Sequence, residues 1–158
     1  MEREIVSILR KNHMTVTTAE SCTGGMIASR IVNVSGASEV FMEGYITYAS
    51  ASKEKILGVR HDTIERFGVV SAETAKEMAD GARRVAEADF ALSVTGIAGP
   101  SGGTIDKPVG LVYIGCSSKK DTRVIRNVFD GDRDAVREQA VVHALALLKE
   151  ALLEIEEA

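Results

Sequence analysis

Two adjacent nucleophile candidates, Ser21 and Cys22, follow a short β-prone run, Met14 to Thr18, and precede a pair of glycines. Where a strand hands over to a helix, a serine can expose its hydroxyl, and the next backbone N–H groups carry positive partial charge. The segment could therefore hold a nucleophile and its oxyanion donors within one turn. Cys22 is the second candidate, because a nearby helix N-terminus lowers a thiol pKa. The alternative is that Ser21 or Thr23 only caps the helix.

A serine nucleophile needs a base, and the segment Tyr48-Ala49-Ser50-Ala51-Ser52-Lys53 offers a lysine. Lys53 can act as a base if desolvation or a neighbouring cation lowers its pKa, and Tyr48 could relay the proton or orient the lysine. The alternative is that Lys53 is a solvated residue in the first turn of a helix. The role of Glu20 stays open between a buried charge partner for Lys53 and a surface acid.

A glycine-rich segment, Thr95 to Thr104, follows a buried-strand pattern and is a candidate for phosphate binding. Its four glycines let backbone approach a ligand closely and present N–H groups to an anion. Arg133, just after Gly131-Asp132, could clamp a phosphate or a carboxylate with two hydrogen bonds. The alternatives are a flexible loop tip and an exposed arginine in the first turn of a helix.

Composition excludes several other classes of protein. A net charge of -4 with 4% aromatic residues and no Trp argues against a nucleic-acid surface. No apolar run approaches the length of about 20 residues that spans a bilayer, and no signal-peptide pattern is present. The three histidines, His13, His61 and His143, lack the spacing of zinc ligands, and no dinucleotide fingerprint occurs. We expect a cytoplasmic protein without a metal or cofactor.

The periodicity of apolar residues predicts alternating helices and strands within one domain, residues 1–158. We expect a three-layer α/β/α sandwich with a mixed, mostly parallel sheet of about five strands, the last two antiparallel. Ser52, Ser71 and Asp132 are the predicted helix N-caps. The predicted helices are Glu2 to Asn12, Gly24 to Val34, Lys53 to Leu57, Asp62 to Phe67, Ser71 to Ala86 and Asp132 to Glu156. The predicted strands are Met14 to Thr18, Val40 to Tyr48, Phe90 to Val94, Val109 to Ser117 and Thr122 to Phe129.

These segments together resemble the CinA C-terminal domain family, the nicotinamide-nucleotide amidohydrolases. The resemblance covers nearly the whole chain, and so many motifs in the same order are highly specific. The motifs are AESCTGG (Ala19 to Gly25), GYITYASASK (Gly44 to Lys53), LGV (Leu57 to Val59), GVVS (Gly68 to Ser71), SVTGIAGPSGGT (Ser93 to Thr104), KPVG (Lys107 to Gly110) and GDR (Gly131 to Arg133).

The resemblance implies hydrolysis of the carboxamide of nicotinamide mononucleotide to nicotinic acid mononucleotide and ammonia, without a cofactor. It implies Ser21 as nucleophile, Lys53 as general base and Tyr48 as its assistant. The implied oxyanion donors are the amides of Thr23, Gly24 and Gly25. The implied nucleotide-binding residues are Thr95, Gly96, Ala98, Gly99, Gly102, Gly103, Thr104 and Arg133.

Two other functions fit the same residues. A nucleotide-binding or regulatory module would keep the pocket and lack turnover. A related enzyme would act on a different amide or ester of a nucleotide. We expect a small-molecule pyridine nucleotide as partner, no nucleic acid, no membrane, and a homo-oligomer.

Overall fold

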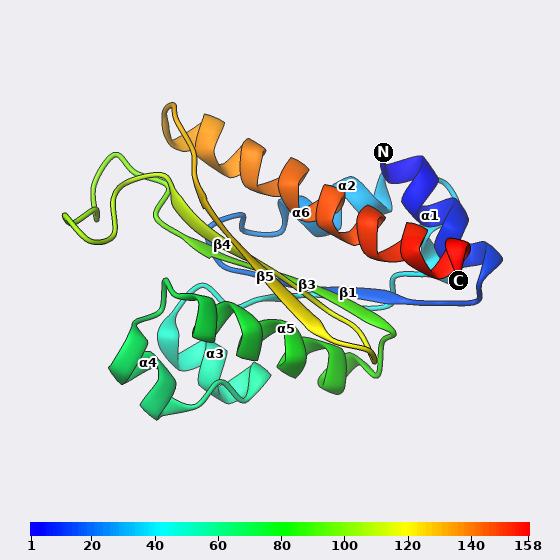
Figure 1. Ribbon diagram of the computed structural model, residues 1–158, viewed down its shortest axis with the longest axis horizontal. Coiled ribbons are helices and arrows are strands. Elements are labelled where there is room, and N and C mark those ends of the chain that lie inside the picture. The colour runs from blue at the N-terminus through cyan, green and yellow to red at the C-terminus, as the bar shows by residue number, and fades with distance from the viewer.

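A five-stranded sheet lies between two layers of helices in the computed structural model, which describes all 158 residues (Figure 1). The helices are α1 (Glu2–Lys11), α2 (Met26–Val32), the 3-10 helix η1 (Ala37–Glu39), α3 (Ser50–Leu57), α4 (His61–Phe67), α5 (Ala72–Ala86) and α6 (Arg133–Glu157). The strands are β1 (Val16–Glu20), β2 (Tyr45–Ile46), β3 (Phe90–Gly96), β4 (Leu111–Ser117) and β5 (Thr122–Val128). Helices α1, α2 and α6 cover one face, and α3, α4 and α5 cover the other, which confirms the predicted sandwich (Figure 1).

The strand order is β2-β1-β3-β4-β5. Strands β2, β1 and β3 are parallel, β4 runs antiparallel to β3, and β5 runs antiparallel to β4. Four strands therefore point the same way, and the antiparallel pairing of the last two strands is confirmed. The carboxyl ends of β2, β1, β3 and β5 meet at one edge of the sheet, which is the edge where open α/β sheets bind ligands.

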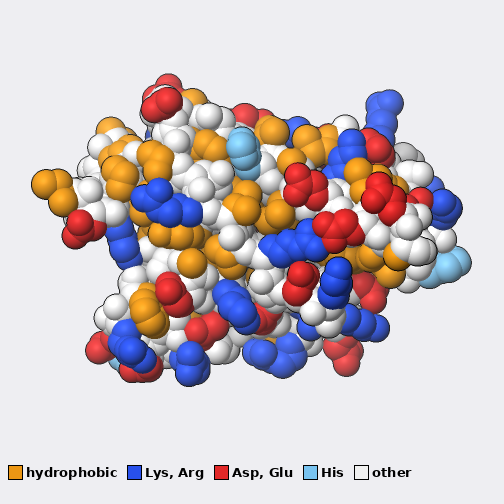
Figure 2. Space-filling view, viewed as in Figure 1, with side chains coloured by type: hydrophobic (Ala, Val, Ile, Leu, Met, Phe, Trp, Pro, Cys, Tyr) orange, Lys and Arg blue, Asp and Glu red, His pale blue; other side chains and the backbone are white.

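The two faces of the sheet bury cores of different size. Helix α6 lies along one face, and its apolar residues join those of α1, α2 and the sheet in the larger cluster of buried side chains. A smaller cluster on the other face joins α3 and α5 to β1 and β3. Over the surface drawn in Figure 2, basic and acidic side chains are interspersed. No helix combines the length and the apolar character that a bilayer crossing requires.

Two predicted helix caps are confirmed by hydrogen bonds. The Ser71 hydroxyl accepts from the amide of Thr74 at 3.1 Å, and α5 ends at Ala86 as predicted. The Asp132 carboxylate accepts from the amide of Ala135 at 2.9 Å at the start of α6. The third predicted cap is wrong.

The boundaries of several elements need correction. Helix α3 begins at Ser50, so Ser52 lies in its first turn and is not the N-cap. Helix α2 begins at Met26, because Gly24 and Gly25 have φ of +58° and +104° and belong to the preceding turn. Strand β2 is only Tyr45–Ile46, far shorter than predicted.

The shortening of β2 has a local cause. In the segment before β2, the hydroxyl of Thr17 donates to the carbonyl of Glu43 at 2.7 Å. A side chain thus makes the connection that ladder hydrogen bonds would make in a longer strand. Strand β1 lies two residues further along the chain than predicted, since it spans Val16–Glu20 rather than Met14 to Thr18.

Candidate active site

A cavity of about 180 Å³ opens at the carboxyl edge of β1 and β3. It brings together segments from five parts of the chain, and its lining contains two cations but no carboxylate and no histidine. The lining residues are Ser21, Cys22, Tyr48, Ser50, Lys53, Val69, Val70, Thr95, Gly96, Ala98 and Arg133. Seven of these are residues that the sequence predicted for the site: Ser21, Tyr48, Lys53, Thr95, Gly96, Ala98 and Arg133.

The Lys53 ammonium group lies beside the Ser21 hydroxyl. Lys53 is 1% exposed and Ser21 is 9% exposed. The Lys53 Nζ lies 3.1 Å from Ser21 Oγ, 2.7 Å from the Thr47 carbonyl oxygen and 3.2 Å from the Tyr48 carbonyl oxygen. The interpretation of Lys53 as a solvated helix residue is therefore wrong.

Burial lowers the pKa of Lys53 from 10.5 to about 8, because desolvation disfavours the charged amine and no carboxylate lies against it. A neutral amine has two N–H donors and one lone pair. The carbonyls of Thr47 and Tyr48 accept the two N–H bonds, which leaves the lone pair for the Ser21 hydroxyl. The same three oxygens accept the three N–H bonds of the ammonium form, so this set of contacts accommodates both protonation states of Lys53.

The pKa of the Cys22 thiol is shifted upwards, whereas its position in the sequence predicted a downward shift. Burial raises its pKa to about 11, since the side chain is 6% exposed and helix α2 begins four residues later, at Met26. The predicted lowering of the Cys22 pKa by a helix N-terminus is therefore wrong. A thiol in this state is a poor nucleophile at neutral pH.

The Glu20 carboxylate occupies the N-terminus of α2. Glu20 is fully buried at the end of β1 and accepts hydrogen bonds from the Thr23 hydroxyl (2.7 Å) and from the amides of Ile27 (2.9 Å) and Ala28 (3.1 Å). It is thus neither a partner of Lys53 nor a surface acid. The amides of Ile27 and Ala28, in the first turn of α2, are thus bound by the chain's own carboxylate.

The three amides predicted as oxyanion donors differ in their surroundings. The Gly24 amide donates to the Ser21 carbonyl at 3.1 Å, and the Thr23 residue is fully buried, with its hydroxyl bound to Glu20. The Thr23 and Gly25 amides donate no hydrogen bond to the protein. None of the three residues lines the cavity.

Tyr48 and Arg133 meet at the mouth of the cavity. Tyr48 is 62% exposed, and its hydroxyl accepts a hydrogen bond from the Arg133 guanidinium at 3.3 Å, while only its carbonyl contacts Lys53. A second nitrogen of Arg133 donates to the Gly99 carbonyl at 2.8 Å. The phenol therefore faces the arginine rather than the lysine.

The glycine-rich loop contributes only its first part to the cavity. The Thr95 hydroxyl donates to the Val69 carbonyl at 2.8 Å and so fixes the Val69–Val70 wall, which the sequence did not single out as part of the site. Gly102, Gly103 and Thr104 are exposed and lie outside the lining.

Arg137 is a second residue that the sequence reasoning missed. It is half-buried on α6, and its guanidinium donates to the carbonyls of Cys22 (2.8 Å) and Thr23 (3.3 Å). Its position four residues after Arg133, on the same face of a helix, was the signal available in the sequence.

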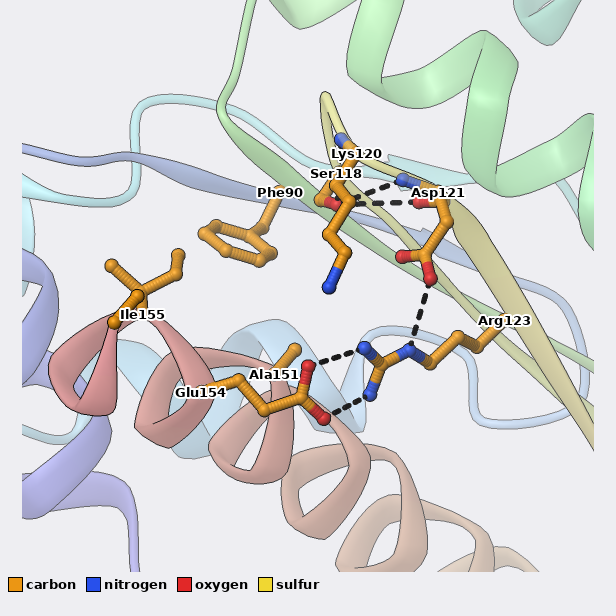
Figure 3. Close-up of a pocket in the computed structure, with 9 residues that line it drawn as sticks. Phe90, Ser118, Lys120, Asp121, Arg123, Ala151, Glu154 and Ile155 are labelled. Carbon is orange, nitrogen blue, oxygen red and sulfur yellow. Dashed lines mark hydrogen bonds and ion pairs between the residues drawn. The ribbon is translucent and has the colours of Figure 1, made fainter.

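A second cavity, of about 200 Å³, lies at the opposite edge of the sheet, between the β4–β5 turn and the end of α6 (Figure 3). Arg123 binds the Glu154 carboxylate, with one contact of 2.7 Å, and the Asp121 carboxylate at 3.4 Å. The Ser118 hydroxyl contacts the backbone of Lys120 and Asp121 and no base. This cavity lacks a paired nucleophile and base, so we place the candidate site at the first cavity.

The fold and the site define an α/β domain with a buried Ser–Lys pair at the carboxyl edge of its parallel strands. The chain belongs to the CinA C-terminal domain family, which matches residues 1–152. A CinA-like protein from Kosmotoga olearia is 52% identical over 153 residues, which are 97% of this chain and 37% of that protein. This chain spans less than two fifths of the length of the curated relatives that it matches.

Solved structures of similar proteins have the same fold. The competence/damage inducible protein CihA from Agrobacterium tumefaciens is 40% identical, with a TM-score of 0.92 over 96% of this chain and 92% of that one. A competence-damaged protein (CinA) superfamily protein from Klebsiella pneumoniae is 33% identical, with a TM-score of 0.93 over 97% of this chain and 96% of that one.

Proposed function

We propose that this protein hydrolyses the carboxamide of nicotinamide mononucleotide to nicotinic acid mononucleotide and ammonia, with Ser21 as nucleophile and Lys53 as base. The observation that carries the proposal is the 3.1 Å contact between the Lys53 amine and the Ser21 hydroxyl inside a cavity that holds no other base. The choice of substrate rests on the resemblance of the sequence motifs to the nicotinamide-nucleotide amidohydrolases.

In the first half of the reaction, the Lys53 lone pair takes the Ser21 proton as Oγ bonds to the carboxamide carbon. The carbonyl π bond opens to an oxyanion, which nearby amides stabilise. The Lys53 ammonium then donates its proton to the amide nitrogen, the C–N bond breaks, and ammonia leaves an acyl-Ser21 ester.

In the second half, a water molecule loses a proton to Lys53 and attacks the ester carbon. The tetrahedral species collapses, the C–Oγ bond breaks, Ser21 Oγ recovers the proton from Lys53, and the carboxylic acid product leaves and loses its own proton to solvent. Lys53 thus alternates between base and acid, the double duty that histidine has in catalytic triads.

The cationic mouth of the cavity supports binding of an anionic nucleotide. Arg133 is exposed, and it is already oriented by the Gly99 carbonyl and the Tyr48 hydroxyl. A phosphate at this point would orient the pyridine ring towards the Ser–Lys pair without taking part in bond cleavage.

The test is ammonia release from nicotinamide mononucleotide by the wild type and by matched variants. We expect Ser21→Ala and Lys53→Met to lose activity by a factor of about 10³ or more, whereas Cys22→Ala and the exposed control Lys55→Met retain it. If the wild type binds the nucleotide tightly and releases no ammonia, the chain is a binding module. If the protein instead hydrolyses a different nucleotide amide or ester, and nicotinamide mononucleotide competes poorly with it, that compound is the substrate.

A further inference from the structure

The amide of Cys22 is a hydrogen-bond donor next to the proposed nucleophile that has no acceptor in another residue. Cys22 lines the cavity, and its N–H donates to no other residue of the protein. Buried or half-buried backbone N–H groups nearly always have a partner, so an unpaired one at a cavity wall marks a place where a ligand atom can bind.

The direction of this amide is set by the peptide group to which it belongs. The Gly24 amide donates to the Ser21 carbonyl at 3.1 Å, and the Ser21–Cys22 peptide is trans. Because C=O and N–H point in opposite directions in a trans peptide, the Cys22 N–H points away from the interior of the turn. It is also the amide that directly follows the nucleophile, as in the oxyanion holes of enzymes with a nucleophile elbow.

Arg137 holds the next two peptides of the same turn. Its guanidinium binds the carbonyls of Cys22 and Thr23, and it does not line the cavity. The Thr23 carbonyl belongs to the peptide whose N–H is that of Gly24. Arg137 therefore holds the Thr23–Gly24 peptide in place. The amide of that peptide holds the Ser21 carbonyl, and the Ser21 carbonyl sets the direction of the Cys22 N–H on the same peptide group.

We propose that the Cys22 main-chain amide is an oxyanion donor and that Arg137 is the positioning residue that aims it. The proposal rests on the proposed Ser–Lys chemistry and moves the oxyanion contact one residue towards the nucleophile from the Thr23 to Gly25 amides. The cation of Arg137 acts through two carbonyl oxygens and never touches the substrate.

The test compares Arg137→Met and Arg137→Lys with Arg126→Met, an exposed arginine on β5 that forms no hydrogen bond through its side chain. Two rates are measured: ammonia release from nicotinamide mononucleotide, and reaction of Ser21 with an alkyl fluorophosphonate followed by intact mass. In the second reaction the Ser21 O–P bond forms, the P–F bond breaks, fluoride leaves, and the Ser21 proton passes to Lys53. Both reactions develop negative charge on an oxygen beside Ser21, and the final extent of labelling counts the competent sites.

We expect Arg137→Met to lower kcat and the labelling rate per competent site by about 10²-fold, the effect of losing one oxyanion donor. KM should stay unchanged, and so should the pH at which the rate reaches half of its maximum on the acid side. Arg137→Lys should recover part of the rate, and Arg126→Met should match the wild type.

Other outcomes would overturn the proposal. One is an Arg137→Met protein with wild-type kcat and labelling rate, and another is a loss confined to KM or to the fraction of competent sites. A wild type that is labelled at Ser21 but releases no ammonia contradicts only the proposed substrate, and the labelling rates still decide the role of Arg137. A wild type that does neither overturns both proposals.

Discussion

The pH dependence of the reaction gives the sharpest test of Lys53 as the base. Its pKa is lowered to about 8 by burial, and only the neutral amine can accept the Ser21 proton. The sign follows directly: the active form is the deprotonated one, so the rate rises as the pH rises through the pKa of Lys53 and levels off above it.

The magnitude follows from the same value. With a pKa of about 8, roughly 9% of Lys53 is neutral at pH 7 and about 90% at pH 9, so kcat/KM should rise about tenfold between these values. The lining has no histidine or carboxylate, and burial raises the pKa of the Cys22 thiol to about 11, above this interval. A nucleotide phosphate loses its second proton near pH 6, below the interval of interest.

The assay is the initial rate of ammonia release between pH 6.5 and 9.5 at constant ionic strength, with stability of the enzyme checked at each pH. Lys53→Ala should abolish the rise of the rate with pH. Added methylamine should restore slow turnover, and the rise of that rate with pH should move towards the pKa of the added amine. A flat wild-type profile across this range would refute the assignment. A limb with its midpoint near pH 6.5 would also refute it, because that value is typical of histidine.

Three further predictions concern binding and stability. Arg133→Met should raise KM for the nucleotide by about 10- to 100-fold with little change in kcat, measured by steady-state kinetics, because a charged hydrogen bond to the phosphate is lost. Glu20→Ala should lower the free energy of unfolding in urea by about 2–4 kcal/mol, since a buried and a half-buried amide of α2 and the buried Thr23 hydroxyl lose their acceptor. Gly81→Ala should also destabilise, by about 1–3 kcal/mol, although alanine is the better helix former, because a Cβ at this point of α5 would overlap the Leu57 carbonyl oxygen. Wild-type stability in the Gly81 variant would contradict this close approach of α3 and α5.

Local signals in the sequence were sufficient for most of the fold. Ser71 and Asp132 cap the two helices that the pattern predicted, because a cap is a contact between residues three apart. The apolar run from Phe90 became the central strand β3, and the short polar turn after β4 predicted an antiparallel pair. The sequence pattern did not predict how short β2 is, because one of the bonds that join this segment to β1 comes from the Thr17 side chain, which is distant in the sequence.

For the site, too, local motifs identified the residues, whereas their contacts depend on the tertiary structure. The residue types and order of the motifs by themselves determined the family, the Ser21 nucleophile candidate and the Lys53 base candidate. Only the tertiary structure decided that Lys53 is buried against Ser21, that Glu20 serves α2, and that Arg137 grips the nucleophile turn from α6. These facts depend on desolvation and on hydrogen bonds between residues far apart in the sequence. A pKa or the direction of an amide is a property of that assembled environment, and no run of neighbouring residues encodes it.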